Sequence, residues 1–538
     1  MSLFSRRSRA RVVGLVGALV AGLTVPLLAS SPASAVDRPA IQPLPANLES
    51  IRAQEAIALY GSPEIRPLEA RKTAIIAMGD SEMSGEGVGN YEPGTHTGAV
   101  PNWCDRSIDQ AVHRTGIPAD VTYNVACSGG EPKDLVYGSG YTQWNELNQG
   151  ENLAIKARNT RIKLVWVIVG ANGAGNIEFG PVATDCAVRR LLFQGACWPT
   201  YTDVWATRVA GSQQDVTNAL NSIKQTMTNA GYLASDYQLV LQSYPSPGSP
   251  DVEDNPNFPG WYSGGCVLYL KDLAFARNKA VPLFEKGLRA AAAAAGARYL
   301  DASRLFHGYE VCTESPSVRG LWIETGILFE NGQLNENAAR QSFHPNYRGH
   351  TMFASCITAF YNSTDPTATC LAPNSTGQTV LLPGLLEFKE LKNIGTGNCL
   401  DAYGYNSRVG TNLNPYGCHG GRNQGFWYDP ARQTIVLELS HDRCLTASSV
   451  ANGKYVDLGD CTGAATQKFV FSGQQIKSAG NANLCLGFDS PLLGLWTPRL
   501  QLQTCSSSNN KQKWNFQSRN YANPVGYGHD DFIGSMTY

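Results

Sequence analysis

The sequence predicts an α/β domain with a parallel sheet, followed by an all-β domain, with the division near residue 362. Apolar runs typical of buried strands alternate with longer helical stretches before that point, and three similar units follow it. The length of 538 residues leaves room for two or three folded units, at roughly 150 residues each. With 43% hydrophobic residues the composition is that of a globular protein, which excludes wholesale disorder.

Four runs rich in Ile, Val, Leu and Tyr predict the strands of the first domain: 73–78, 121–126, 162–169 and 237–242. Buried parallel strands have this composition. Before the fourth run, Val216, Leu220, Ile223 and Met227 repeat at helical spacing. A later helix is indicated by Asp272 as a possible N-cap, an alanine run at 290–295 and Gly296 as its end. This alternation favours a doubly wound sheet, in which reacting groups collect at the carboxyl ends of strands.

The first 35 residues are expected to be a signal peptide. Four arginines between positions 6 and 11 precede an apolar run at 12–28, and residues 33–35 are small, as a cleavage site requires. An uncleaved membrane anchor is the alternative. Because no later segment approaches the roughly 20 apolar residues that cross a bilayer, we expect a secreted, soluble protein without stable membrane insertion.

Charge and cysteine usage exclude several classes of protein. Lys and Arg number 43 against 44 Asp and Glu, so a general nucleic-acid binder is not expected. No CxxC or His-rich cluster suggests zinc, and His350 is expected to be a helix-surface or packing residue. We therefore expect no metal and no cofactor. An even number of cysteines behind a signal peptide indicates disulfides. Pairing the cysteines in order along the chain would give seven disulfides, although the sequence leaves the connectivity open. The cysteines are Cys104, Cys127, Cys186, Cys197, Cys266, Cys312, Cys356, Cys370, Cys399, Cys418, Cys444, Cys461, Cys485 and Cys505.

Four residues at the ends of predicted elements suggest acyl-transfer chemistry. Ser81 stands where the run 73–78 breaks into a glycine-rich turn, and a serine in such a turn can present its hydroxyl as a nucleophile. Gly129 and Asn172 follow the second and third runs and could donate hydrogen bonds to an oxyanion. His344 precedes an apolar helical segment that ends at residue 361 and is available as a general base.

This order of Ser, Gly, Asn and His over about residues 70–361 resembles the SGNH (GDSL-like) ester hydrolases, in particular the secreted, disulfide-bonded bacterial lipases and esterases. The resemblance implies a flavodoxin-like α/β sandwich with Ser81 as nucleophile and His344 as base. It also implies an oxyanion hole formed by the Ser81 N–H, Gly129 and Asn172. The pairs Cys104/Cys127, Cys186/Cys197 and Cys266/Cys312 fit the disulfides of these enzymes.

The sequence departs from that family's pattern at two positions. Many members carry Asp directly after the third-block Asn, where this chain has Gly173. Members with a full triad carry Asp three residues before His, where this chain has Gln341. We expect the backbone carbonyl of Gln341 to accept the His344 ring N–H and fix its tautomer, giving a Ser–His dyad. Glu82 and Glu86 flank Ser81; they could shape leaving-group polarity, but such acids are more often solvated loop residues.

Beyond residue 385 three units begin with Cys-Leu at positions 399, 444 and 485 and end with Gln-x-Phe or Gln-x-Trp at 424, 467 and 512. Each unit encloses one more cysteine, and short alternating runs with Gly and Asn turns predict β-strands. This pattern resembles the ricin-type β-trefoil carbohydrate-binding family over about residues 386–517. The resemblance implies an internal disulfide in each unit.

Only the first unit has the side chains that sugar binding requires: an acid for hydroxyls, an aromatic face and amides. They are Asp401, Asn414, Tyr416, Asn423 and Gln424. At the acid and aromatic positions the second unit has Thr446 and Gly459, and the third has Gly487 and Gln503. We therefore predict one sugar site. Gln424 is its weakest member, because the glutamine of the terminal motif usually completes the core.

The predicted organisation is a signal peptide (1–35), a hydrolase domain (36–361), a linker (362–385), a trefoil (386–517) and a tail (518–538). The expected function is that of an exported, monomeric serine ester hydrolase acting on acyl esters of carbohydrate, acetyl esters in particular, with the trefoil binding a polysaccharide or glycan. Hydrolysis of lipid esters by a lipase or phospholipase is the alternative. A glycan-binding lectin with an inactive hydrolase scaffold is the alternative of a different class.

Overall fold

The computed structural model describes residues 37–249, 265–373, 377–430, 432–440, 443–490 and 497–518. The predicted signal peptide lies outside these residues, as does the predicted tail apart from residue 518. Among the helices in the described ranges, none has the length and apolar character needed to span a bilayer.

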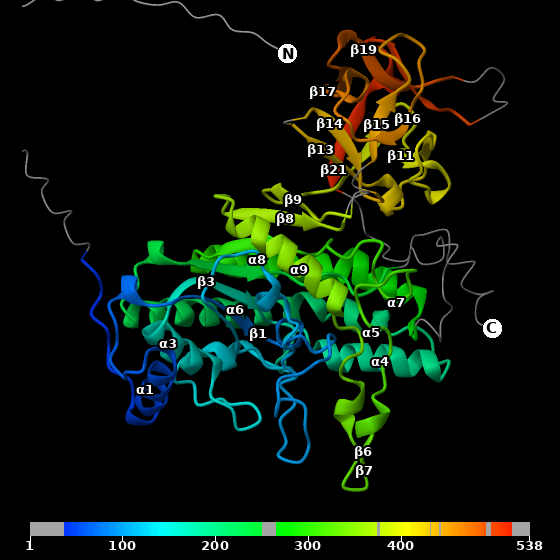
Figure 1. The fold of residues 1–538 in the computed structure, drawn as a ribbon. Helices are drawn as coiled ribbons and strands as arrows, with labels where there is room; N and C mark the ends of the chain where they lie inside the picture. Colours follow the sequence, from blue (N-terminus) through cyan, green and yellow to red (C-terminus); the bar gives the residue numbers. More distant parts are fainter. Residues whose placement is uncertain are drawn as a thin grey trace, which may run out of the picture. The chain divides into compact units, whose positions relative to one another are not determined.

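A seven-stranded sheet forms the centre of the first region, with the order β2-β1-β3-β4-β5-β8-β9 (Figure 1). Its strands are β1 (Thr73–Gly79), β2 (Val121–Asn124), β3 (Arg161–Ile168), β4 (Gln238–Gln242), β5 (Arg298–Asp301), β8 (Thr367–Leu371) and β9 (Val380–Pro383). All neighbours pair in parallel except β8 and β9. The four apolar runs seen in the sequence are β1 to β4, so the predicted parallel sheet is confirmed. A short hairpin, β6 (Phe329–Glu330) with β7 (Gln333–Leu334), projects from this region (Figure 1).

Helices fill the connections between these strands. They are α1 (Ala46–Tyr60), α2 (Ser81–Ser84), α3 (Gln149–Asn159), α4 (Phe179–Leu191), α5 (Trp198–Thr202), α6 (Trp205–Asn229), α7 (Leu270–Phe275), α8 (Val281–Ala295) and α9 (Tyr347–Tyr361). Helix α6 packs against α3 and α8. The four apolar residues predicted to share a helix face, at positions 216, 220, 223 and 227, are all buried on α6, because a helix that covers a sheet turns its apolar stripe inward.

The helix predicted to begin at Asp272 has a different start. Tyr269 is the N-cap of α7, and Asp272 lies inside the helix. A π-helical turn (Ala276–Ala280) then joins α7 to α8. The Asp272 carboxylate instead accepts a hydrogen bond from the backbone N–H of Trp198, 74 residues away in sequence. The local pattern of an acid before an apolar run misled the prediction, because the acid's partner lies on another helix. The predicted end is confirmed, since Gly296 has a φ of 65°, which glycine adopts without steric cost.

The segment predicted as a linker, 362–385, contributes two strands to the sheet, so the linker prediction is wrong for those residues. Strand β8 pairs in parallel with β5, and β9 pairs antiparallel with β8. A disulfide between Cys356 and Cys370 ties β8 to α9. These strands were not predicted because each contains only three or four apolar side chains among Ser, Thr and Pro residues. Their stability as strands comes from burial against the neighbouring strands of the sheet.

The second region is built of antiparallel strands. They are β10 (Lys389–Asn393), β11 (Cys399–Ala402), β12 (Leu413–Tyr416), β13 (Phe426–Asp429), β14 (Thr434–Leu437), β15 (Arg443–Ala447), β16 (Val456–Asp460), β17 (Phe469–Ser472), β18 (Gln475–Ser478), β19 (Asn481–Phe488), β20 (Leu500–Thr504) and β21 (Trp514–Ser518). The first strand, β10, pairs with the last, β21, which closes the set. Apolar side chains from all three units form one shared core, because no single unit is large enough to enclose its own.

All seven sequential cysteine pairs are present as disulfides. They are Cys104–Cys127, Cys186–Cys197, Cys266–Cys312, Cys356–Cys370, Cys399–Cys418, Cys444–Cys461 and Cys485–Cys505. The last three each lie within one unit of the second region, as predicted. Cross-links of this kind persist in oxidising compartments.

Candidate active site and sugar site

Ser81 is held at the carboxyl end of β1, where the strand turns into the short helix α2. Asp80 caps that helix, and its side chain accepts a hydrogen bond of 3.1 Å from the backbone N–H of Glu82. Gly79 makes the turn possible, because a Cβ at this position would lie 1.8 Å from the carbonyl oxygen of Ile168 on β3. The serine therefore stands at the sheet edge with the helix N-terminus at its own backbone.

His344 reaches Ser81 across 263 residues of sequence. Its ring nitrogen Nε2 lies 2.7 Å from the Ser81 Oγ. The other ring nitrogen, Nδ1, lies 3.0 Å from the backbone carbonyl oxygen of Ser342. Because a carbonyl oxygen only accepts, Nδ1 carries the ring proton and Nε2 is free to accept the proton of the serine hydroxyl.

The carbonyl that orients His344 is thus that of Ser342, and the prediction that assigned this role to Gln341 is wrong. The Gln341 carbonyl accepts the backbone N–H of His344 at 3.3 Å, and its side-chain amide donates to Glu324 at 2.9 Å. Phe343 has a φ of 63°. This left-handed residue reverses the chain, so the carbonyl of residue 342 faces the ring, whereas that of residue 341 closes the turn.

The two predicted oxyanion donors lie on adjoining loops. The Asn172 side-chain amide follows β3 and donates a hydrogen bond of 3.2 Å to the carbonyl of Gly130, next to Gly129. Gly129 has a φ of 76°, and Cys127 in the same loop is bonded to Cys104. Asn172 and Ser81 line the same cavity as His344. An amide nitrogen has two hydrogens, so the Asn172 amide could donate a second hydrogen bond, as an oxyanion donor must.

A buried acid that sequence reasoning placed in solvent lies beside the Ser–His pair. Glu86 is 1% exposed, and its carboxylate lies 3.8 Å from Nε2 of His344. The Ser128 hydroxyl donates to Glu86 and accepts from the Arg340 guanidinium at 2.8 Å. Burial raises the pKa of the Glu86 carboxyl, while His344 and Arg340 act in the opposite direction.

One sequence feature could have revealed this acid: glycines stand on both sides of it. Gly85 has a φ of 92°, and a Cβ on Gly87 would lie 2.4 Å from the carbonyl oxygen of Pro345. Both positions therefore exclude larger side chains. The Gly-Glu-Gly segment is thus packed directly against the backbone that carries His344, which places the acid in the site.

Asp80, Glu82 and Tyr244 form a second buried acidic group behind Ser81. The Tyr244 hydroxyl donates to the Asp80 carboxylate and accepts the backbone N–H of Ala171 at 3.2 Å. Burial raises the pKa of Asp80 from 3.8 to about 7, and it also raises that of Glu82. The solvated position expected for Glu82 is wrong, because the side chain is buried and lines the same cavity as Ser81 and His344.

A cavity of about 140 Å³ lies beside Ser81, Asn172 and His344. Its walls are mainly apolar and come from α4, α6, α7 and α8, with Phe179, Val182, Trp205, Leu273, Phe275 and Phe284 among the lining residues. A cavity of about 150 Å³ with similar walls accommodates a benzene ring. The space therefore suits an apolar group of roughly six carbon atoms next to the Ser81 side chain.

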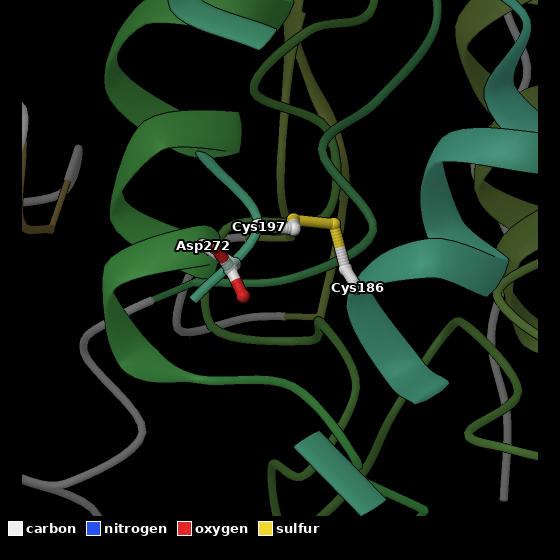
Figure 2. Close-up of side chains that lie close together, drawn as sticks. All are labelled: Cys186, Cys197 and Asp272. Carbon is white, nitrogen blue, oxygen red and sulfur yellow. A yellow bond between two sulfur atoms is a disulfide. The ribbon is translucent and has the colours of Figure 1, made fainter. Parts of the chain in front are cut away.

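Two clusters in the described residues have the composition of metal sites but not the chemistry. One comprises Asp272, Cys186 and Cys197 (Figure 2). The other brings a glutamate near Cys399 and Cys418. In both clusters the sulfur atoms are joined in disulfides, so no thiolate is available as a ligand. His350, the other candidate from sequence, is a packing residue as predicted: it is fully buried and accepts the backbone N–H of Ala111, and burial lowers its pKa to about 3.

The five predicted sugar-site residues lie on β11, β12 and the turn before β13. Asp401 pairs in register with Asn414. The Asn423 side chain donates to the Asp401 carboxylate at 2.9 Å. Tyr416 is 62% exposed, and its ring meets that of His419 edge-on at 5.9 Å. His419 was not predicted; its Nε2 lies 3.4 Å from the Asp401 carboxylate.

Gln424 is fully buried, and both ends of its amide are engaged inside the chain. The nitrogen donates to Asp401 and to the carbonyl of Gly417, and the oxygen accepts the backbone N–H of His419. The assignment of Gln424 to direct sugar contact is therefore wrong. Both of its N–H donors are used within the chain and its amide is fully buried, so it positions Asp401 instead.

In the first unit the glutamine of the terminal motif donates to a carboxylate, that of Asp401. In the other two units the corresponding glutamine donates to a neutral group. Gln467 donates to the Thr446 hydroxyl at 2.9 Å. Gln512 donates to the Gln503 side-chain oxygen at 3.0 Å. Each of these acceptors is thus used within the fold. Among the described residues, only the first unit has a carboxylate as the acceptor of the motif glutamine, so the single sugar site stays a prediction for this unit.

Comparison with known proteins supports this division of the chain. Residues 387–514 match the model of the ricin-type beta-trefoil lectin domain, so the second region is such a domain, as predicted. No curated protein sequence matches the chain.

Among solved structures, an extracellular lipase from Streptomyces rimosus is 20% identical and covers 54% of this chain and 98% of its own, with a TM-score of 0.34. Phospholipase A1 from Streptomyces albidoflavus NA297 is 22% identical, and the alignment covers 55% of this chain and 99% of the phospholipase chain, with a TM-score of 0.33. An earthworm lectin C-terminal domain mutant, solved with 6'-sialyllactose, is 18% identical, and the alignment covers 25% of this chain and 99% of the lectin chain, with a TM-score of 0.22.

Proposed function

We propose that the protein is an exported serine hydrolase of carboxylic esters whose trefoil binds a sugar. The observation that carries the proposal is the 2.7 Å contact between Ser81 Oγ and His344 Nε2. A serine hydroxyl bonded to an oriented imidazole, next to amide donors and an apolar cavity, is the arrangement that acyl transfer requires.

In this mechanism the Ser81 oxygen attacks the ester carbonyl carbon while its proton passes to Nε2 of His344. The tetrahedral oxyanion receives hydrogen bonds from the Ser81 and Gly129 N–H groups and from the Asn172 amide. Collapse breaks the bond to the alcohol, which takes the proton from the imidazolium and leaves an acyl-serine. Water then attacks the acyl-serine through the same steps, which releases the acid and restores the serine hydroxyl.

Glu86 supplies the negative charge that the missing triad acid would provide. The Ser342 carbonyl orients the ring but carries no net charge. The Glu86 carboxylate, 3.8 Å from Nε2, is close enough to stabilise the imidazolium that forms during attack. The Ser128 hydroxyl donates a hydrogen bond that holds the Glu86 carboxylate in place, and the Arg340 guanidinium donates a hydrogen bond to the same hydroxyl.

The cavity favours an acyl group of intermediate length over the acetyl group that the sequence first suggested. An acetyl group would leave most of the 140 Å³ unfilled, whereas a chain of about six carbons would bury its methylenes against apolar walls. Esters of such acids with carbohydrate are the first substrate class. Lipid esters are the second, because the apolar walls suit a fatty acyl chain equally well.

Sugar binding through Asp401, Asn414, Tyr416 and Asn423 would hold the enzyme near glycan-bearing material, which raises the local concentration of substrate without altering the chemistry. The seven disulfides support export, since such bonds form in oxidising compartments.

Covalent labelling tests the proposal. A fluorophosphonate probe should label the wild type at Ser81, and labelling should disappear in S81A. H344A should retain the serine but lose most of the labelling, because the hydroxyl lacks its base. Failure of the wild type to react, together with retained glycan binding, would leave the protein as a lectin with an inactive scaffold.

A further inference from the structure

One segment of the first region, residues 321–334, carries many apolar side chains that the fold leaves unburied. It contains seven large apolar residues, and none of its residues is buried. Trp322 and Ile323 are exposed at its base, while Phe329 and Leu334 on the hairpin β6–β7 are 67% and 70% exposed. An exposed apolar patch of this kind marks a surface that binds something.

The hairpin is specified by its own sequence and presents two of these side chains together. Its turn residues, Asn331 and Gly332, have φ values of 51° and 76°, as the tight Asn-Gly turn of a hairpin requires. Phe329 pairs directly with Leu334 across the two strands, so both side chains lie on one face of the hairpin. Because the hairpin projects from the domain (Figure 1), this face can enter another phase.

The base of the segment is hydrogen-bonded to the loop that carries His344. The backbone N–H of Trp322 donates to the Ser342 hydroxyl at 2.9 Å. The backbone N–H of Arg319 donates to the His344 carbonyl at 2.9 Å. Whatever the hairpin binds is therefore held beside the loop that orients the histidine of the proposed active site.

The exposed apolar area is too small for a stable protein partner. A large side chain has roughly 200 Å² of surface, so the exposed parts of the four side chains amount to about 450 Å². This is about half of the roughly 800 Å² that each partner buries in a stable protein–protein interface. A lipid surface, in contrast, accepts a projecting apolar tip without a complementary shape.

The charge of the segment indicates which kind of lipid surface is suitable. Residues 320–335 include Glu324 and Glu330 but no Lys or Arg. Anionic lipid surfaces attract clusters of Lys and Arg and would repel these two acids. A neutral or zwitterionic lipid surface therefore fits both the area and the charge.

We propose that the hairpin β6–β7 docks the protein onto a neutral or zwitterionic lipid surface by inserting Phe329 and Leu334 among the acyl chains. Docking itself is a property beyond the proposed hydrolase function. Its consequence rests on that function: docking presents lipid esters, one of the two proposed substrate classes, to Ser81.

Vesicle binding tests the docking apart from hydrolysis. Vesicles of a dialkyl phosphatidylcholine have ether-linked chains and contain no ester, so the protein can be sedimented with them unchanged. We expect the wild type to bind, and the double variant F329S/L334S to bind at least about tenfold more weakly, because two large side chains no longer leave water. The matched control I51S/I57S removes two exposed apolar side chains from α1, which lies apart from the hairpin (Figure 1), and should bind as the wild type does.

Hydrolysis of two esters provides the second measurement. F329S/L334S should hydrolyse soluble 4-nitrophenyl hexanoate at the wild-type rate, since neither side chain lines the cavity beside Ser81, and this also shows that the variant is folded. Hydrolysis of 4-nitrophenyl palmitate carried in the ether-lipid vesicles should fall about tenfold or more.

Several outcomes would overturn the proposal. Hydrolysis of soluble hexanoate by a wild type that does not bind the vesicles would remove the docking and leave the hydrolase function intact. Equal vesicle binding by F329S/L334S and the wild type would also remove it. Stronger binding after addition of a dialkyl phosphatidylglycerol would refute the neutral surface. A wild-type dimer that dissociates in F329S/L334S, measured by analytical ultracentrifugation, would show that a second copy covers the hairpin. Vesicle binding without labelling of Ser81 would instead support the docking and remove the hydrolase function.

Discussion

Shortening the acyl chain of the substrate from six carbons to two tests how the cavity contributes to catalysis. The space beside Ser81 measures about 140 Å³ and has mainly apolar walls. Each buried methylene contributes about 0.8 kcal/mol. Four methylenes therefore amount to roughly 3 kcal/mol, which corresponds to a factor of about 200 in kcat/KM.

The assay is the release of 4-nitrophenol from acetate, butanoate, hexanoate and octanoate esters under identical conditions. We expect kcat/KM to rise about fourfold for each methylene up to six carbons and to level off beyond, where the chain outgrows the cavity. A profile that is flat or that falls from acetate onward would refute the reasoning and return the acetyl-ester hypothesis to first place.

A variant that fills the cavity provides the control. Ala183 on α4 lines the cavity, so A183F should lower kcat/KM for hexanoate at least about tenfold, because the chain loses its buried methylenes, while acetate hydrolysis changes little. The matched substitution T184F adds the same ring at an exposed position of the same helix and should keep the wild-type profile.

Three further predictions concern charged groups. E86Q should lower kcat about 10- to 100-fold with little change in KM, because a charge 3.8 Å from the ring attracts the imidazolium by about 4 kcal/mol at an effective dielectric constant of 20, before desolvation is subtracted. Burial raises the pKa of Asp80 from 3.8 to about 7. Between these pH values the folded chain holds a proton that the unfolded chain has released, so the free energy of unfolding falls as pH rises. In urea titrations D80N should therefore lose less stability than the wild type between pH 4 and 7. D401A should abolish glycan binding measured by calorimetry, while T446A leaves it unchanged.

Each of these predictions has an outcome that contradicts it. Unchanged kcat in E86Q would show that the Ser–His pair works without a nearby carboxylate. Equal pH slopes for D80N and the wild type would mean that the proton resides elsewhere in the buried acidic group. Retained glycan binding in D401A would contradict the assignment of the sugar site, and loss of 4-nitrophenyl ester hydrolysis alongside loss of glycan binding would indicate that the substitution damages the whole chain.

Local regularities in the sequence were sufficient to predict much of the fold. The run at 73–78 became β1 because its side chains suit a strand buried on both faces, and the Gly-Asp-Ser turn after it placed Ser81 at the sheet edge. The threefold Gln-x-aromatic repeat predicted the β-trefoil, whose strands share one apolar core. Strands β8 and β9 were missed, because their few apolar residues acquire meaning only beside β5.

The finer chemistry of the site required the tertiary structure. Glycines around position 86 hinted at close packing, but only the packed chain shows that Glu86 is buried against His344 rather than in solvent. The choice between the carbonyls of residues 341 and 342 depended on one left-handed φ at Phe343.

The sequence alone thus determined strands β1 to β4, helix α6 and the three repeat units, because periodicity and turn chemistry act over short stretches of chain. Tertiary structure decided what lies beside each side chain. The partners of Ser81, Glu86 and Asp272 come from remote segments, and burial, pKa and hydrogen-bond pairing depend on those neighbours rather than on the residues next in sequence.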